Sequence, residues 1–183
     1  MPHTTASQYQ AASRPLTEIV EAVPTDAWTR PSPCEDWTAG DVVAHLIETQ
    51  RELFAGRGVT LGDQPDIHAD PAQAWRGHAE RVQGVLSDDA VPAIAYDGYA
   101  GPTTLGATLQ QFYVWDMYVH RWDIARAVGL DARLTTDELD RIEQGADSFG
   151  DALYMDGICR PAAPAPATAD RRVLLLARLG RVA

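Results

Sequence analysis

Apolar residues recur along the chain at helical spacing, and no segment alternates regularly between apolar and polar positions. An apolar face with steps of three and four residues predicts a first helix that ends at Pro24, with Pro15 at its start or at a kink. The residues of this face are Leu16, Ile19, Val20 and Val23. The opening pattern therefore indicates a helical protein.

Two further helices begin at recognisable N-terminal signals. Thr38 and Asp41 have the spacing of a capping box, and the apolar face that follows them ends at Gly56. Asp70 followed by Pro71 is typical of an N-cap and a first helical position, so a third helix is expected there.

The longest predicted helix runs from Thr104 to about Val128 and ends at Gly129. The connection before it, residues 87–103, is rich in Gly and Pro and has room for a short strand. Steps of three and four residues predict that one face of this helix points into the core. That face comprises Leu105, Leu109, Phe112, Asp116, His120, Asp123 and Ala127.

The C-terminal part adds one capped helix and a shorter one. Thr135 and Glu138 form a second capping-box pattern, and the helix that follows ends near Gly150. A linker rich in Pro and Ala precedes a short helix over 173–179, which stops at Gly180. We therefore predict an all-α fold: a four-helix bundle over residues 1–160, with a linker and a C-terminal helix (161–183) packed on the same domain.

Composition narrows the class of function. The 183 residues carry 15 basic side chains, all arginine, and 26 acidic ones, which gives a formal net charge of −11. Such a charge repels nucleic acids and anionic membrane surfaces, and no apolar run is long enough to cross a membrane. With two cysteines and no signal-peptide pattern, the expected location is the cytoplasm.

Ionisable residues on the inward face of the long helix are the main candidates for chemistry. Asp116 and His120 are four residues apart, so a carboxylate and an imidazole lie one above the other, with Asp123 next on the same face. His45 lies on the apolar face of the second helix and can reach this pair across the bundle. Two imidazoles and one carboxylate form an open, catalytic type of metal site.

A purely structural interpretation competes with this one. A histidine on an apolar face is usually a core residue with a hydrogen bond, and an Asp–His pair at this spacing is often a simple helix-surface contact. Three ionisable groups at core positions are costly to bury without a partner, which favours the metal site. His78 is expected to be a packing residue, and Cys34 a small buried apolar one rather than a reactive thiol.

Two segments are similar to a known family. Pro33-Cys34-Glu35-Asp36-Trp37-Thr38, with the following stretch to His45-Leu46, resembles a signature of the N-terminal, metal-binding domain of mycothiol-dependent maleylpyruvate isomerases. That family belongs to the DinB/YfiT-like superfamily. The stretch from Asp116 to Gly129 resembles its second signature, and the tail from Asp170 to Arg181 resembles an actinobacterial subgroup.

The resemblance implies a DinB-like bundle whose divalent ion, zinc or alternatively nickel, is held by His45, Asp116 and His120. It also implies a low-molecular-weight thiol as cosubstrate. The isomerases have Glu where this chain has Asp116, and they carry a larger C-terminal domain where this chain has only a linker and one helix. The first difference requires a shorter carboxylate to reach the ion, and the second argues against maleylpyruvate as the substrate.

The resulting hypothesis is a metal-dependent, mycothiol-type S-transferase or isomerase that acts on a small electrophile. In it, Asp123, or alternatively a carbonyl group, orients His120 from behind by binding its second ring nitrogen. The alternatives are a non-catalytic, stress-associated metal-binding protein, a non-haem iron enzyme and a purely structural bundle. The family analogy further suggests a homodimer.

Overall fold

The computed structural model describes residues 4–99, 101–155 and 157–182, and the regular secondary structure of these residues is helical apart from one small hairpin and an isolated bridge. The all-α prediction is therefore confirmed. The elements are α1 Thr5–Glu21, α2 Ala39–Ala55, α3 Pro71–Val85, β1 Ala95–Gly98, β2 Gly101–Thr104, α4 Leu105–Thr108, α5 Trp115–Val128, α6 Thr136–Phe149 and α7 Arg171–Arg178.

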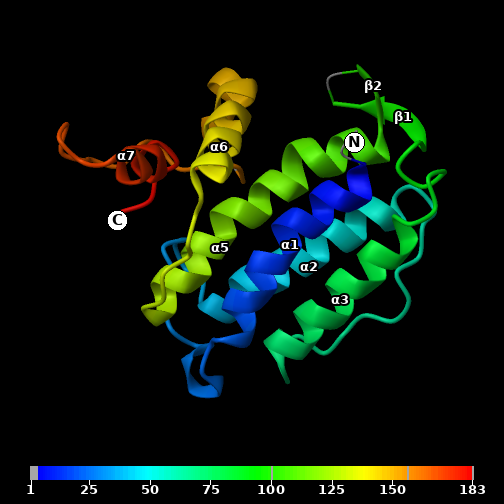
Figure 1. Cartoon of the computed structure of the whole chain (residues 1–183), viewed down its shortest axis with the longest axis horizontal. Helices are drawn as coiled ribbons and strands as arrows, with labels where there is room; N and C mark the ends of the chain where they lie inside the picture. The colour runs from blue at the N-terminus through cyan, green and yellow to red at the C-terminus, as the bar shows by residue number, and fades with distance from the viewer. Residues whose placement is uncertain (1–3, 100, 156, 183) are drawn as a thin grey trace.

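Four long helices, α1, α2, α3 and α5, lie side by side as a bundle (Figure 1). Helix α1 packs against α3 and α5, and α2 packs against the same two helices from the other side. The connection over 56–70 returns along the bundle, so α3 runs in the same direction as α2 (Figure 1). The core lies between these helices, and α5 is buried on nearly all sides because α6 covers its outer face.

Local sequence signals account for most helix ends. The Thr38 and Thr135 capping boxes are both present, with Asp41 and Glu138 bonded back to the cap residues. The side chain of Asp70 caps α3 ahead of its first-turn proline, and Gly129 ends α5 with a left-handed φ of 78°. These predictions are confirmed.

Of the two alternatives for Pro15, a helix start or a kink, the helix start is wrong. Helix α1 begins at Thr5, where Thr4 accepts a hydrogen bond from the Ser7 amide, and it continues through Pro15. A proline in a helix leaves the carbonyl four residues earlier without its donor. Here that carbonyl belongs to Ala11, which lies on the exposed side of α1 where water can replace the missing donor.

The prediction of one regular helix from Thr104 to Val128 also needs correction. The segment Leu109–Val114 is π-helical and separates α4 from α5. A π-turn holds more residues than an α-turn, so it shifts the register of the helix face. As a result Phe112, expected in the core, is 38% exposed, whereas Leu105 and Leu109 are fully buried.

Helix α6 is attached to α5 through a close approach at Gly145. The ring of Trp115 lies so near that a Cβ at Gly145 would be 2.1 Å from Cδ1 of the ring. The ring nitrogen of Trp115 donates to the carbonyl of Ile142 at 3.0 Å. A buried pair of Arg121 with Glu138, at 2.9 and 2.6 Å, joins the same two helices.

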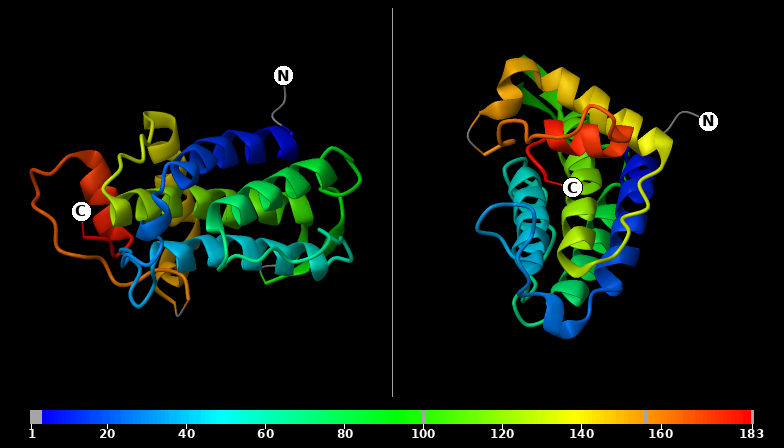
Figure 2. Two further views of the ribbon diagram at one scale, coloured as in Figure 1. Left: turned by 90° about the horizontal axis from the view of Figure 1, so that it is seen from below. Right: turned by 90° about the vertical axis from the view of Figure 1, so that its left-hand side faces the viewer.

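The C-terminal segment lies on α6 and returns towards α5 (Figure 2). Ion pairs join Arg171 of α7 to Asp140 and Glu143 of α6, and Arg178 to Asp147. No helix among the described residues is both long and apolar enough for a membrane crossing.

Candidate metal centre

Three side chains from two neighbouring helices converge on one point. His45 lies in the middle of α2, and Asp116 and His120 lie one turn apart in α5. Nε2 of His45 is 3.1 Å from Oδ2 of Asp116, and Nε2 of His120 is 3.2 Å from Oδ1 of the same carboxylate. The structure thus brings together the three residues that the sequence suggested as metal ligands.

The second ring nitrogen of His120 faces the opposite way. Its Nδ1 lies 2.8 Å from Oδ2 of Asp123, a carboxylate that is fully buried. Burial alone lowers the pKa of His120, but the two carboxylates, Asp116 first, raise it well above its usual value. Asp123 therefore lies within reach of His120, as its spacing suggested, and contacts the ring nitrogen opposite the one that faces Asp116.

The two carboxylates are held in their charged forms. Burial by itself raises the pKa of Asp116, yet the neighbouring His120 and His45 bring it well below its usual value. For Asp123 burial is again outweighed, here first by Arg181 and then by His120, so that its pKa falls to about 2. Anionic carboxylates at neutral pH are suitable ligands and acceptors for a cation.

The loop before α2 forms one wall of the site. Its ends are joined by a bridge between Pro31 and Thr38, and Asp36 has a left-handed φ of 61°, which Asp tolerates better than most residues. This loop places Trp37 beside the site, with its ring centroid 4.9 Å from that of His45 and 6.2 Å from that of His120. The indole shields the two imidazoles from water on that side.

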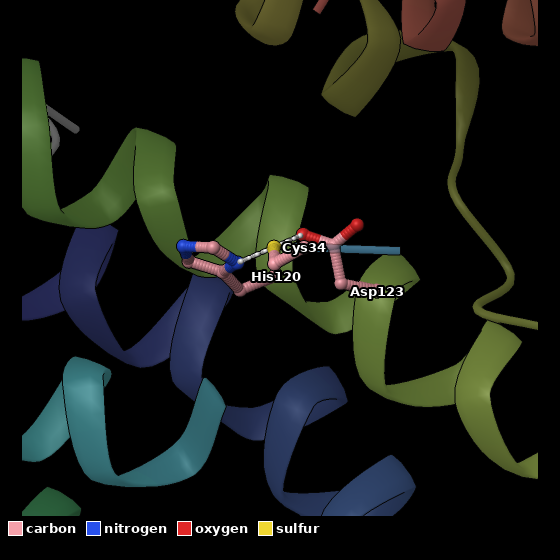
Figure 3. A group of neighbouring side chains, drawn as sticks. All are labelled: Cys34, His120 and Asp123. Carbon is pink, nitrogen blue, oxygen red and sulfur yellow. Dashed lines mark hydrogen bonds and ion pairs between the residues drawn. The ribbon is translucent and has the colours of Figure 1, made fainter. Parts of the chain in front are cut away.

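The same loop brings a thiol to the rear of the site. Sγ of Cys34 lies 3.3 Å from Oδ2 of Asp123, to which it donates, and 3.9 Å from Nδ1 of His120 (Figure 3). The expectation of a buried apolar role for Cys34 is therefore wrong, since its neighbours are charged and polar. Helical periodicity could not reveal this contact, because Cys34 precedes the helix and meets its partners only through the tertiary fold.

Arg181 is a site residue that the sequence reasoning missed. Its Nε donates to Oδ1 of Asp123 at 3.2 Å and its Nη2 donates to Oδ2 at 2.9 Å. Nη2 is also 3.7 Å from Sγ of Cys34. The available sequence signal was an arginine just after the glycine that ends the last helix, which by itself gives no reason to place it beside Asp123.

Within the described part of the chain, two groups of side chains are thus close enough to hold a metal ion, and both use His120. One consists of His45, Asp116 and His120, the other of Cys34, His120 and Asp123, and the ligand atoms of each lie within 4.8 Å of one another. The second group already contacts the guanidinium of Arg181, whose charge would repel a metal cation there.

The first group fits a divalent ion better. Donor atoms 2.0–2.2 Å from a tetrahedral ion are roughly 3.4 Å apart, close to the 3.1 and 3.2 Å observed around Asp116. The side chains of His45 and Asp116 are 26% and 23% exposed, which leaves an approach from solvent. The bond from His120 to Asp123 is the usual arrangement behind a metal-binding histidine.

His78, expected to be a packing residue, is fully buried in the bundle. Its Nε2 lies 2.9 Å from Oε1 of Gln50, which also accepts a hydrogen bond from the Tyr9 hydroxyl at 3.0 Å. Burial, with smaller effects from Arg51 and Arg81, lowers the pKa of His78 to about 3. His78 is therefore a neutral core histidine.

Relatives of this chain are found among uncharacterized proteins. Two from Mycobacterium tuberculosis, "Uncharacterized protein MT0763" of strain CDC 1551 / Oshkosh and "Uncharacterized protein Rv0738" of strain ATCC 25618 / H37Rv, are each 24% identical over 147 residues. The match covers 72% of this chain and 73% of each relative. No solved structure is significantly similar to the chain.

The family comparison covers the bundle itself. Residues 9–125 match the profile of the mycothiol maleylpyruvate isomerase N-terminal domain, a span that is more than half of the chain and includes His45, Asp116 and His120. The chain therefore belongs to the mycothiol maleylpyruvate isomerase N-terminal domain family.

Proposed function

We propose that this protein binds a divalent metal ion, zinc or alternatively nickel, through His45, Asp116 and His120. We further propose that it uses this ion as an S-transferase-like enzyme, joining a low-molecular-weight thiol of the mycothiol type to a small electrophile. The observation that carries the proposal is the convergence of two imidazole nitrogens on one carboxylate at 3.1 and 3.2 Å. Family membership supports it.

Such an ion would supply a deprotonated thiol at neutral pH and an electrophilic centre to polarise a carbonyl. The chain's own residues orient His120 and line the site. Asp123 keeps Nδ1 of His120 engaged, so Nε2 is the nitrogen directed at Asp116. Trp37 gives the thiol an apolar wall, and the partly exposed side of His45 and Asp116 is where both reactants would enter.

Metal analysis of the purified protein tests the site. We expect stoichiometric zinc or nickel in the wild type and its loss in His45→Ala and His120→Ala, because each variant removes one of three ligands. His68→Ala is the matched control, since His68 is exposed and outside the site. Undiminished metal in both site variants would disprove the proposal.

Turnover separates an enzyme from a non-catalytic metal-binding protein. The metal-loaded protein is incubated with mycothiol and a panel of small electrophiles, and thioether formation is measured against the His45→Ala variant. Conjugation that depends on His45 supports the transferase. Metal binding without turnover would favour the binding protein, and oxygen consumption with ferrous iron would favour a non-haem iron enzyme, which also uses two histidines and a carboxylate.

A further inference from the structure

The last described turn of the chain places a cation inside the protein. Arg181 follows α7, is 8% exposed, and donates through Nε and Nη2 to the two oxygens of Asp123. Its remaining nitrogen, Nη1, donates to the carbonyl of Leu179 at 2.8 Å. All three nitrogens of this guanidinium are thus engaged.

The backbone is shaped to deliver this side chain. Gly180 has a left-handed φ of 79°, and a Cβ there would lie 2.7 Å from Cβ of Arg160. The amide of Arg181 then bonds back to the carbonyl of Leu176 at 2.9 Å. Only glycine suits both the conformation and the close approach, so the turn fixes the direction of Arg181.

The guanidinium lies beside a ligand set that could otherwise hold a metal. Cys34, His120 and Asp123 offer a sulfur, a nitrogen and an oxygen within 4.8 Å of one another, and Nη2 of Arg181 lies 2.9 Å from the oxygen and 3.7 Å from the sulfur. A carboxylate as deeply buried as Asp123 needs positively charged partners, and the first of these is Arg181, which binds both of its oxygens.

We propose that Arg181 is a built-in cation that takes the place of a metal in the Cys34–His120–Asp123 group. It thereby directs metal binding to the opposite nitrogen of His120. With Arg181 present, Asp123 stays bound to Nδ1 of His120. Only Nε2 of that ring is then left for a metal ion, on the side of His45 and Asp116. The statement that metal binding is directed to Nε2 of His120 rests on the proposed function. The statement that Arg181 takes the place of a metal does not.

Cobalt(II) is the probe, because a bound thiolate gives a sulfur-to-cobalt charge-transfer absorption that imidazole and carboxylate ligands do not. We expect no such absorption from the wild type with cobalt. The absorption appears in Arg181→Met and disappears again in Arg181→Met with Cys34→Ser. The second cysteine, Cys159, has its Sγ 3.8 Å from Nη1 of Arg181, and the absorption persists in Arg181→Met with Cys159→Ser. Arg181→Lys, which keeps the positive charge, behaves as the wild type.

Arg178→Met is the matched control, because Arg178 pairs with Asp147 on α6 and does not touch the site. Arg181→Gln, whose amide can still donate to Asp123, gives the same absorption and serves if circular dichroism shows that Arg181→Met is unfolded. A thiolate absorption in the wild type, or none in the folded neutral variants, would overturn the proposal.

The same experiment distinguishes this inference from the proposed function. If the wild type binds no cobalt but Arg181→Met binds it through Cys34, the His45 site fails and the role of Arg181 stands. If wild-type binding depends on His45 and Arg181→Met shows no thiolate absorption, the proposed site stands and Arg181 has only a structural role.

Discussion

At the scale of single residues, His120 is the centre of the candidate site because its two nitrogens have different partners. Nε2 faces Asp116 and His45, and Nδ1 faces Asp123, so one imidazole joins the open and the buried halves of the site. The chemistry of each half is set by its charges: two partly exposed side chains lie in front, and an ion pair of Asp123 with Arg181 lies behind.

The burial of a second histidine, His78, predicts how the free energy of unfolding depends on pH. Its pKa is about 3 in the folded chain, below the value near 6.5 of an unfolded one. Between these values the unfolded chain binds a proton that the folded chain does not, so the free energy of unfolding falls as pH falls through this range. His78→Leu removes this contribution.

Urea denaturation at several pH values between 4.5 and 7.5 measures the effect. We expect the slope against pH to be steeper in the wild type than in His78→Leu, by up to about 1.4 kcal/mol per pH unit. His68→Ala, which replaces an exposed histidine, should keep the wild-type slope. Equal slopes in the wild type and His78→Leu would show that His78 is not held neutral.

At the scale of elements, local signals predicted where helices begin and end, whereas non-local contacts determined the irregularities inside them. The capping boxes at Thr38 and Thr135 are short-range patterns, and both are present. Local signals left open whether Pro15 begins α1 or lies inside it, and they did not predict the π-helical segment before α5, because surrounding structure rather than propensity sets both features. Phe112 was wrongly assigned to the core because the π-helical segment shifts the register of the helix face.

The contact between α5 and α6 predicts a sharp difference between two glycines. Gly145→Ala should destabilise the protein by about 1–3 kcal/mol, because the new methyl group would overlap the ring of Trp115. Gly77→Ala, in α3 with nothing within 4 Å, should be neutral or stabilising by about 0.5–1 kcal/mol. Thermal unfolding of both variants checks this, and equal shifts would contradict it.

At the scale of the whole molecule, the C-terminal segment completes the rear of the site. Arg181 reaches Asp123 across 58 residues of sequence, and Arg160 of the linker pairs with Glu35 in the loop that carries Cys34. Both ends of the segment are thus attached to the walls of the candidate metal centre.

This attachment predicts a large stability effect from one terminal residue. Arg181→Met removes from the buried Asp123 the guanidinium that binds both of its oxygens, which should lower the free energy of unfolding by about 3–5 kcal/mol. Arg178→Met breaks only an exposed pair and should change it by about 0–1 kcal/mol. Urea denaturation with a chelator present compares the two, and similar losses would argue against the ion pair as the cause.

The candidate site could be predicted from the sequence only in part. The spacing of Asp116 and His120 on one helix face follows from helix geometry, and His45 was identified by its position on an apolar face. The structure brings these three together, while their metal binding remains a prediction. The environment of Cys34 and the presence of Arg181 were missed, since no periodic pattern relates a loop or a chain end to a helix.

By itself the sequence determined what depends on neighbours within a few residues: the helical class, the caps, the end of α5 at Gly129 and the pairing of Asp116 with His120. Only the tertiary structure decided which surfaces meet. It set His45 against Asp116, turned the chain at Gly180, and placed Arg181 beside Asp123. The physical reason is that helix geometry is local, whereas the pairing of buried charges depends on the packing of distant segments.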